Sequence, residues 1–443
     1  MSRVGIFGAG WVGLVTGTCF AELGHDVVIR DVVPAKIDAL RHGKVPFVED
    51  DVPELLARNR ERLTFTLDVR EIAACDFLFI CVDTPPTHSG DADLSRVWTV
   101  IDELPELTGR PVVVMKSTVP VGTGEKVRAG LDERGLAHVG YVSNPEFLAE
   151  GHAVRDFMSP DRIVIGAFES SDAERVASLY APLEAQIVEC DVNSAEMIKL
   201  AANAFLMTRI SFINEIANVC EVTGADVVKV AEGVGLDHRL GPHFLRAGIG
   251  YGGSCFPKDS LALKQLASNS GYHFQLLSAV IEVNELQKRR VIGKLKRHLG
   301  QQLSGKTVAL LGLAFKPHTD DMREAPSIVL AARLLAEGVD VRAWDPVADG
   351  TKLPKGVEVV GSVAEAVYGA HAAVIVTEWP ELKTLASPET RSAMANPLIV
   401  DGRNLLDPDE TRRAGFAYEG IGRLVRETDV LPETPEPSVE TAI

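Results

Sequence analysis

Several features that define other classes of protein are missing from this 443-residue sequence. No Cys-x-x-Cys pair occurs among its six cysteines, and no histidine cluster has metal-ligand spacing, so we expect neither a metal site nor a disulfide framework. No run of 18 apolar residues predicts a membrane span, and no secretory leader precedes the first apparent strand. We therefore expect a cytoplasmic protein without a membrane partner.

The charge balance is equally one-sided. The net charge is −17, and no block of lysine and arginine interrupts it, so nucleic acid is a poor candidate partner. With 46% hydrophobic and 24% charged residues, the composition is that of an ordinary globular protein. A chain of this length suggests about three domains.

The first positive signal is a glycine turn near the N-terminus. A short apolar run leads into G-A-G-W-V-G and then an amphipathic stretch, the order in which a dinucleotide site places strand, turn and helix. Gly8 permits the tight turn, Gly10 lets a pyrophosphate approach the backbone, and Gly13 lets helix and strand pack closely. Asp31 ends the next strand and can bind both ribose hydroxyls, which favours NAD over NADP, although the adjacent Arg30 weakens that preference slightly.

The predicted strands 77–82 and 112–115 continue the alternation of strand and helix. Ligands of open parallel sheets bind beyond the carboxyl ends of the strands, where Thr84 and Thr118 follow. Their hydroxyls could reach a cofactor or a bound water, or could equally form helix caps or turns.

A further predicted strand, 141–143, is followed by N-P-E-F-L-A-E-G. Glu146 and Glu150 are four residues apart and would share a face if the segment were helical. Two such carboxylates are more often solvated surface, but their place at a strand end favours a functional role.

Residues 194–222 contain neither glycine nor proline and predict a long helix, with Asn193 or Ser194 as N-cap. Lys199 and Asn203 lie one turn apart among apolar neighbours. The lysine could simply extend its ammonium to solvent, or the pair could hold a developing oxyanion. A second helical run, 276–299, is interpreted as an interdomain spine.

The stretch 248–259, G-I-G-Y-G-G-S-C-F-P-K-D, places a thiol behind a run of glycines. Lys258 and Asp259 follow Cys255 closely, so a cation and a carboxylate are available to activate a nucleophile. An isolated cysteine is more often a small buried hydrophobe. The dinucleotide fold favours a nucleophilic Cys255 over a buried structural one, because it would supply an electrophilic carbon for the thiol to attack.

Residues 305–346 repeat the pattern of residues 3–33: strand, glycine turn, helix, strand and a final aspartate. Gly312 and Asp345 are 33 residues apart instead of the 23 between Gly8 and Asp31, and the glycine triplet has decayed to G-L-A. The second copy is therefore predicted to hold a different nucleotide or phosphate. From residue 427 the chain is rich in Glu, Pro and Thr and is predicted to be disordered.

These motifs, in this order, resemble the UDP-glucose/GDP-mannose dehydrogenase family, most specifically N-P-E-F-L-A-E-G, G-G-S-C-F-P-K-D and G-L-A-F-K-P-H-T-D-D-M-R. The resemblance covers residues 1–425. It implies an α/β fold of two Rossmann-like doubly wound domains joined by a central all-helical dimerisation domain with a long spine helix. We place the NAD domain at 1–192, the central domain at 193–300, the UDP-sugar domain at 301–426 and an acidic tail at 427–443.

The resemblance implies a double oxidation of a nucleotide sugar's primary alcohol to a carboxylate, consuming two NAD. Cys255 resembles the thiol that captures the aldehyde. Lys199 and Asn203 would hold the oxyanion, Asp259 and Thr118 would position water, and Glu146 would be the acid/base for thioester hydrolysis.

The resemblance further implies two sets of contacts. For the cofactor they are Gly8, Gly10, Trp11, Val12, Gly13, Asp31, Lys36, Thr84, Thr118, Glu150, Lys258 and Arg323. For the sugar nucleotide they are Glu146, Phe147, Leu148, Ala149, Glu150, Lys199, Asn203, Arg239, Phe244, Leu245, Arg246, Ala247, Gly248, Gly252, Lys316 and Arg403.

Within the family, G-Y-G-G-S-C-F-P-K-D resembles the branch that oxidises UDP-glucose. GDP-mannose and UDP-N-acetylmannosamine remain alternative substrates, and a non-catalytic nucleotide-sugar sensor is an alternative of another class. Arg239 resembles an arginine that reaches the neighbouring subunit's site, which implies a homodimer. Two departures from the family pattern are Trp11, where tyrosine is common, and Asp83, where glycine is common.

Overall fold

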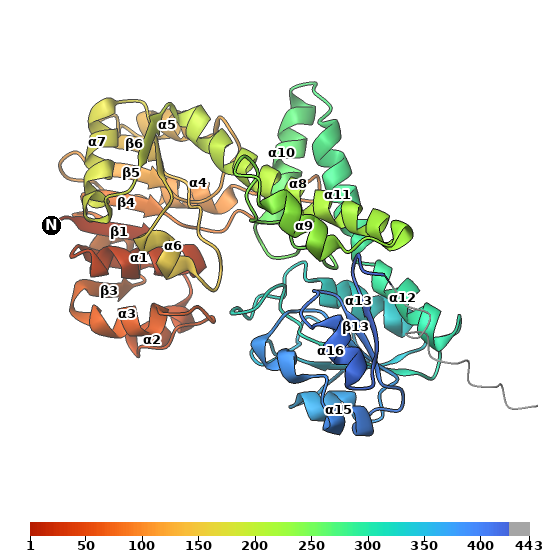
Figure 1. The fold of residues 1–443 in the computed structure, drawn as a ribbon. Coiled ribbons are helices and arrows are strands. Elements are labelled where there is room, and N and C mark those ends of the chain that lie inside the picture. Colours follow the sequence, from red (N-terminus) through yellow and green to blue (C-terminus); the bar gives the residue numbers. More distant parts are fainter. Residues whose placement is uncertain (425–443) are drawn as a thin grey trace, which may run out of the picture. The chain divides into compact units, whose positions relative to one another are not determined.

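The computed structural model describes residues 1–424, so the predicted tail lies outside the described residues. The chain divides into two compact units, one formed by Met1–Phe205 with Lys258–Gln275 and the other by Leu206–Pro257 with the chain from Leu276 onward (Figure 1). Among the described residues, no helix is both long and apolar enough to cross a membrane.

The first unit is built on an eight-stranded sheet in the order β3-β2-β1-β4-β5-β6-β7-β8. All neighbouring strands are parallel except β6 and β7, which are antiparallel. The order reverses between β1 and β4, and such a reversal is where open parallel sheets bind ligands. The strands are β1 (Arg3–Phe7), β2 (Asp26–Arg30), β3 (Leu63–Thr66), β4 (Phe77–Ile80), β5 (Val112–Met115), β6 (Gly140–Ser143), β7 (Ile163–Ala167) and β8 (Ile187–Cys190).

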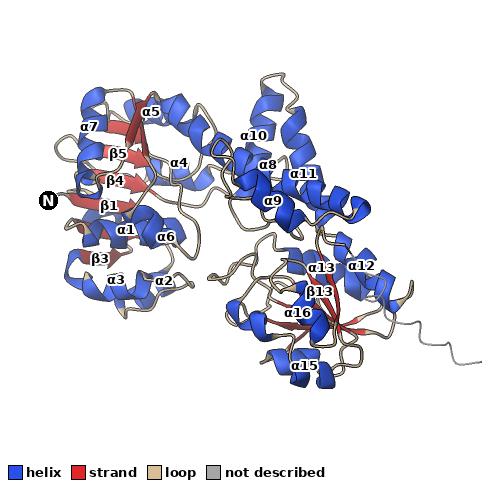
Figure 2. Ribbon diagram, viewed as in Figure 1, coloured by secondary structure: helices blue, strands red, loops and turns tan. Residues whose placement is uncertain are grey.

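Helices cover both faces of this sheet, as Figure 2 shows. Along β4, Phe77 and Phe79 enter one apolar core while Leu78 and Ile80 enter the other, because successive side chains of a strand point to opposite faces. The helices are α1 (Trp11–Glu22), α2 (Pro34–Arg41), α3 (Val52–Arg58), α4 (Ser95–Asp102), α5 (Thr123–Glu133), α6 (Ala153–Met158), α7 (Ser170–Leu179) and part of α10 (Phe256–Asn269), with 3₁₀ turns Arg60–Arg62, Val69–Ile72 and Ala181–Leu183.

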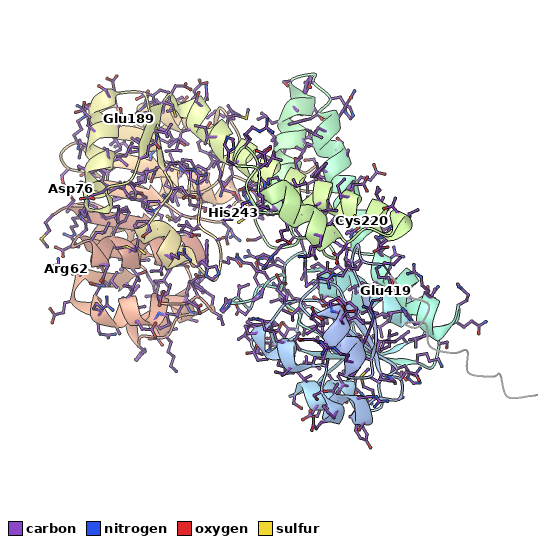
Figure 3. The ribbon with its side chains drawn as sticks, viewed as in Figure 1. Arg62, Asp76, Glu189, Cys220, His243 and Glu419 are labelled. Atoms are coloured by element: carbon purple, nitrogen blue, oxygen red, sulfur yellow. The ribbon has the colours of Figure 1, made fainter. Side chains whose placement is uncertain are left out.

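The two edges of this sheet differ in what they carry. Asp76, labelled in Figure 3, precedes β4 and accepts a hydrogen bond from the backbone N–H of Arg3 (2.8 Å), so it marks the amino edge of the sheet. The glycine turn after β1 and the threonine loops after β4 and β5 lie at the carboxyl edge, where a ligand is expected.

The second unit contains a six-stranded, fully parallel sheet in the order β11-β10-β9-β12-β13-β14, the same pattern as the first six strands of the other sheet. One apolar core joins this sheet to surrounding helices. Its strands are β9 (Thr307–Leu311), β10 (Asp340–Trp344), β11 (Glu358–Val359), β12 (Ala372–Ile375), β13 (Leu398–Asp401) and β14 (Ala417–Gly420).

Long helices connect the two sheets along the chain. The longest, α8 (Val192–Thr223), begins in the first unit and ends in the second. The others of the second unit are α9 (Val227–Gly235), α11 (Gln275–Gln287), α12 (Arg290–Leu299), α13 (Pro326–Ala336), α14 (Val363–Val367), α15 (Pro388–Ala393) and α16 (Pro408–Arg413), with a 3₁₀ turn at Pro380–Thr384.

The predicted fold class is confirmed: two Rossmann-like sheets and a helical middle with one long helix. Three local expectations differ from the structure. The run 276–299 is two helices, interrupted at Lys288–Arg289. The segment with Glu146 and Glu150 is a loop, so the two carboxylates do not share a helical face. Helix α8 starts at Val192, and Asp191 accepts the Ser194 N–H (2.8 Å) in place of the predicted caps.

Candidate active site

The glycine turn after β1 has the shape that a pyrophosphate needs. Gly8 has a φ of +99°, and a Cβ on Gly13 would lie 1.9 Å from the Gly8 carbonyl oxygen, so turn and helix are packed through glycine alone. At Gly10 the nearest atom to an added Cβ is 3.9 Å away, which leaves open space above the turn. No side chain caps the N-terminus of α1, and its free N–H groups suit an anion.

The acidic residue after β2 is held in place by this turn. Asp31 is buried and accepts hydrogen bonds from Ala9 N (2.8 Å), Val33 N (2.9 Å) and Lys36 Nζ (2.9 Å). These donors outweigh the effect of burial, which alone would raise its pKa, and hold the Asp31 pKa below its usual value. The neighbouring Arg30 is engaged elsewhere, since its guanidinium pairs with Glu103 at 2.7 Å.

The threonine loops meet beside the turn. Thr84 is buried and donates its hydroxyl to the Thr118 carbonyl (2.8 Å), which joins the loops that follow β4 and β5. Asp83 pairs with Arg96 (2.8 Å) and points outward. Trp11 and Val12 are half-buried in the first turn of α1.

The loop that follows β6 carries a buried ion pair. Glu146 Oε1 lies 2.7 Å from Lys199 Nζ of α8, and each side chain is 4% exposed. Burial raises the pKa of Glu146, but the Lys199 ammonium and the Leu148 N–H (2.7 Å) outweigh it and hold the pKa below its usual value. These carboxylates are therefore buried rather than solvated, and Glu150 is buried as well.

The remaining residues of this loop lie close to the same charges. The Arg162 guanidinium stacks 3.7 Å from the centre of the Phe147 ring, and Lys199 Nζ lies 5.6 Å from that centre. The N–H of Ala149 donates to Asp156 (2.9 Å). The loop is thus fixed by polar contacts at several points.

A second pair lies one helical turn further along α8. Asn203 donates its amide to Asp259 (2.6 Å), and Lys258 Nζ lies 2.6 Å from the other oxygen of the same carboxylate. Asp259 is 1% exposed and lies in the first turn of α10. Of the two alternatives for Lys199, extension of the ammonium to solvent is thus wrong: Lys199 and Asn203 are both buried and contact other side chains.

Cys255 directly precedes α10 and belongs to the second unit. Its sulfur is half-buried, 3.6 Å from the Ser254 hydroxyl. The glycines before it are required by packing: a Cβ on Gly252 would meet the Glu324 carbonyl at 2.4 Å, and one on Gly253, where φ is +87°, would meet the Phe315 ring at 2.9 Å. The Gly253 N–H donates to the Arg323 carbonyl (2.8 Å).

The other expected sugar contacts of the second unit surround this loop. Arg403 donates to the Gly250 and Val376 carbonyls (2.9 and 2.7 Å), and Gly248 N donates to Asn214 (2.9 Å). Phe244 has a left-handed φ of 61°, an uncommon conformation for an aromatic residue. Of the remaining expected residues, Leu245 and Ala247 are buried, Lys316 is half-buried, and Arg239, Arg246 and Arg323 are exposed.

Sequence reasoning missed two groups beside the 144–151 loop. Lys116 is 5% exposed and donates to the Asn144 amide oxygen (3.1 Å), which also accepts the Tyr180 hydroxyl (2.6 Å). Glu49 is 4% exposed and binds the same loop from the other end. A lysine at the end of an apolar strand was a usable signal for the first, whereas Glu49 sits in a segment without any motif.

The expected site residues form two clusters, one within each unit. The dinucleotide turn, the threonine loops and the Lys199, Glu146, Asn203 and Asp259 network belong to the first unit, and the Cys255 loop with Arg403 and Gly248 belongs to the second. A doubly wound sheet with a free dinucleotide turn and a buried carboxylate–lysine pair defines a dinucleotide-dependent dehydrogenase.

Comparison with known proteins identifies which kind. Residues 2–184, 193–286 and 309–408 match the NAD binding, central and UDP binding domains of the UDP-glucose/GDP-mannose dehydrogenase family. The chain belongs to that family. The predicted resemblance and the predicted NAD cofactor are therefore confirmed.

Close relatives extend along nearly the whole chain. The UDP-glucose 6-dehydrogenase TuaD of Bacillus subtilis is 45% identical over 432 residues, 96% of this chain and 94% of its own. The UDP-glucose 6-dehydrogenase of Pseudomonas aeruginosa is 45% identical over 441 residues, 95% and 97%. The structure of a UDP-glucose dehydrogenase from Pyrobaculum islandicum superimposes with a TM-score of 0.89 at 37% identity, covering 96% of this chain and 98% of its own.

Proposed function

We propose that this enzyme oxidises the primary alcohol of UDP-glucose to the carboxylate of UDP-glucuronate, with Cys255 as the covalent nucleophile. The observation that carries the mechanism is the buried Lys199–Glu146 pair at 2.7 Å, one helical turn from the Asn203–Asp259 hydrogen bond. A single alcohol oxidation needs neither a nucleophile nor a second acid/base, whereas a double oxidation needs both. When bound, NAD accepts a hydride from the sugar carbon in each oxidation.

In the proposed sequence, the Cys255 sulfur attacks the aldehyde carbon formed by the first oxidation. The new carbon–sulfur bond moves the carbonyl electrons onto oxygen, where Lys199 and Asn203 donate hydrogen bonds to the developing charge. The resulting thiohemiacetal retains a hydrogen on the reacting carbon and can be oxidised to a thioester. Covalent capture thereby prevents loss of the aldehyde.

Hydrolysis of the thioester needs a base that is ionised at neutral pH. Glu146 meets this condition because Lys199 holds its pKa below the usual value. We assign it the proton of the attacking water, which Asp259 and Thr118 would position. The carbon–oxygen bond forms, the carbon–sulfur bond breaks, and Cys255 leaves as a thiolate.

The binding roles follow the two folds. We assign the pyrophosphate to the turn of Gly8, Gly10 and Gly13 and the ribose to Asp31, and we assign the sugar nucleotide to residues 146–150, 244–248 and Arg403. The described cysteines are all free, which suits our assignment to the cytoplasm.

The decisive assay measures NADH per sugar with UDP-glucose, GDP-mannose and UDP-N-acetylmannosamine in parallel. Two NADH per UDP-glucose is the expected result; one would indicate a simple alcohol oxidation, and none a nucleotide-sugar sensor. Cys255→Ser should stop net turnover at the aldehyde or hemiacetal level, while Cys190→Ser, at another half-buried thiol, should remain active. Full production of UDP-glucuronate by Cys255→Ser would refute the thioester route.

The proposed homodimer is supported by an apolar stripe on α8. Phe205, Phe212 and Val219 lie seven residues apart, two turns each, and are 62%, 52% and 57% exposed. Exposed aromatic side chains on one helical face are typical of an interface with another subunit. We assign this face to the contact between two copies of the chain.

Arg239 is proposed to act in the partner's site. It is exposed on the loop after α9, where Asp237 holds its guanidinium at 2.6 Å and Arg209 binds the Leu240 and Gly241 carbonyls at 2.7 Å. Mixing Arg239→Ala subunits with Cys255→Ser subunits would give heterodimers with one complete site, so activity should return to about a quarter of wild type. If both variants stay inactive after mixing, Arg239 acts within its own subunit.

A further inference from the structure

Glu49 has no assigned role, yet it is a buried carboxylate that accepts three hydrogen bonds beside the cofactor turn. It lies just before α3 and is 4% exposed. Its Oε2 accepts Trp11 Nε1 (2.7 Å) and Gly151 N (2.6 Å), and its Oε1 accepts Ala153 N (2.8 Å). Within residues 1–424, Glu49 forms no ion pair, so three neutral N–H groups satisfy its charge.

These three donors come from two functional segments. Trp11 is the first residue of α1, immediately after the dinucleotide turn. Gly151 ends the loop that carries Glu146 and Glu150, and Ala153 begins α6. The carboxylate is therefore the point at which the cofactor turn and the loop of the acid/base are joined, across more than 100 residues of sequence.

The chemistry of the three donors explains why a carboxylate is used. A buried anion is tolerated only when its oxygens are fully hydrogen-bonded, and each such bond is stronger than a bond between neutral groups. A glutamine has only one accepting oxygen, and its NH₂ group would face an N–H donor. At position 11, an indole can donate, whereas phenylalanine cannot.

We propose that Glu49 is a positioning residue that couples the dinucleotide turn, through Trp11, to the 144–151 loop that carries the acid/base Glu146. This inference rests on the proposed function for the role of Glu146, but the coupling itself concerns only contacts within the first unit. Because Glu49 holds both segments, a disturbance of either one is transmitted to the other.

Trp11→Phe tests the coupling directly, because within the described residues the hydrogen bond from Trp11 to Glu49 is what links its side chain to the loop. Hydrogen exchange of the peptide that spans Gly151 and Ala153 should become faster in Trp11→Phe, without NAD present. A merely structural indole would leave that peptide unchanged, and this result would overturn the proposal.

Glu49→Gln tests whether loss of the carboxylate disturbs the cofactor turn. The Kd for NAD is measured by calorimetry, and the emission of Trp11 is obtained by subtracting the fluorescence of Trp11→Phe. We expect the Kd for NAD to rise about tenfold, the loss of one bond to a charged group, and the Trp11 emission to shift. Glu54→Gln, an exposed carboxylate in the adjacent helix, is the matched control and should change neither. The double variant Trp11→Phe/Glu49→Gln should be no weaker than Glu49→Gln alone.

The outcomes separate this inference from the proposed function. An unchanged Kd and emission in Glu49→Gln, or additive effects in the double variant, would overturn the coupling whatever the wild-type substrate proves to be. A wild-type enzyme that yields no NADH from UDP-glucose would overturn the proposed function while leaving the exchange and fluorescence results interpretable. If Glu49→Gln does not fold, the exchange experiment on Trp11→Phe decides alone.

Discussion

Lys199 Nζ and Glu146 Oε1 lie 2.7 Å apart in an environment where each side chain is 4% exposed. The pair joins α8 to a loop that is 53 residues earlier in the sequence. A buried pair of this kind is weak evidence for stability, since desolvation offsets much of the attraction. Its consequence is chemical: the carboxylate stays ionised, and the ammonium stays aimed at one place.

Glu146→Gln should therefore separate the two halves of the proposed reaction. The amide keeps an acceptor for Lys199 but cannot take a proton from water, so thioester hydrolysis should become rate-limiting. Rapid mixing should show a burst of about two NADH per active site followed by a rate at least 100-fold below wild type. A proportional loss of the burst and of the steady rate would instead assign Glu146 to binding.

Two glycines of the dinucleotide turn should fail for different reasons. Gly10→Ala adds a Cβ whose nearest neighbour is 3.9 Å away, so the protein should fold normally and lose NAD affinity through contact with the pyrophosphate. Gly13→Ala places its Cβ 1.9 Å from the Gly8 carbonyl oxygen and should destabilise the fold itself. Urea unfolding with NAD titration distinguishes them; equal stability of both variants would contradict the packing argument.

The two sheets could be predicted from the sequence, whereas the break between α11 and α12 could not. The glycine spacing and the alternation of strands predicted both sheets, and β5 was placed at its observed limits, because apolar runs and turn residues are local signals. The break of the 276–299 run at Lys288–Arg289 has no proline or glycine to announce it. There the Lys288 side chain is 1% exposed, and such burial of a lysine depends on tertiary packing and not on local sequence.

The residues of the candidate site were predicted mainly from motifs, but the side chains that they contact were not predicted. Lys199 and Asn203 could be placed on one helical face by spacing alone, but their acceptors Glu146 and Asp259 are 53 and 56 residues away. Long-range pairs of this kind depend on how loops return to the sheet edge. For Glu49, no residue type or spacing near it indicates three donors more than 30 residues away.

Lys116 should give the enzyme a distinctive stability profile in alkali. Burial lowers its pKa to about 8, against 10.5 for the free side chain, so the unfolded chain binds more protons between these values. The free energy of unfolding should accordingly gain about 3 kcal/mol from this group as the pH rises from about 8 to 10.5. Below pH 8 both states are protonated and the slope disappears.

The measurement is the difference in unfolding free energy between wild type and Lys116→Met, followed across that pH range in urea. The exposed Lys126 provides the control, because Lys126→Met should give a flat difference. A flat difference for Lys116→Met as well would mean that Lys116 is hydrated in the folded protein.

A buried cluster in the second unit should set the acid limit of stability. Glu419 of β14, labelled in Figure 3, accepts Lys294 (3.0 Å), Arg297 (2.6 Å) and His298 (2.7 Å) and is 1% exposed. Burial raises its pKa, but His298 and Lys294 outweigh this and hold the pKa below the usual value. Because the pKa of Glu419 is lower in the folded state, this carboxylate stabilises the fold above about pH 4.5. Its contribution to the free energy of unfolding is lost as the pH falls further.

Glu419→Gln removes the charge and leaves Lys294 with Glu221 alone, at 2.6 Å. Because the variant breaks buried ion pairs by removing one partner only, we expect a loss of about 3–5 kcal/mol at pH 7. The loss should shrink as the pH falls below 4.5, since the wild-type Glu419 carboxylate then binds a proton more readily in the unfolded chain than in the fold. Chemical unfolding at pH 7 and pH 4 measures both values, and a loss that is the same at the two pH values would show that Glu419 contributes through its shape and not through its charge.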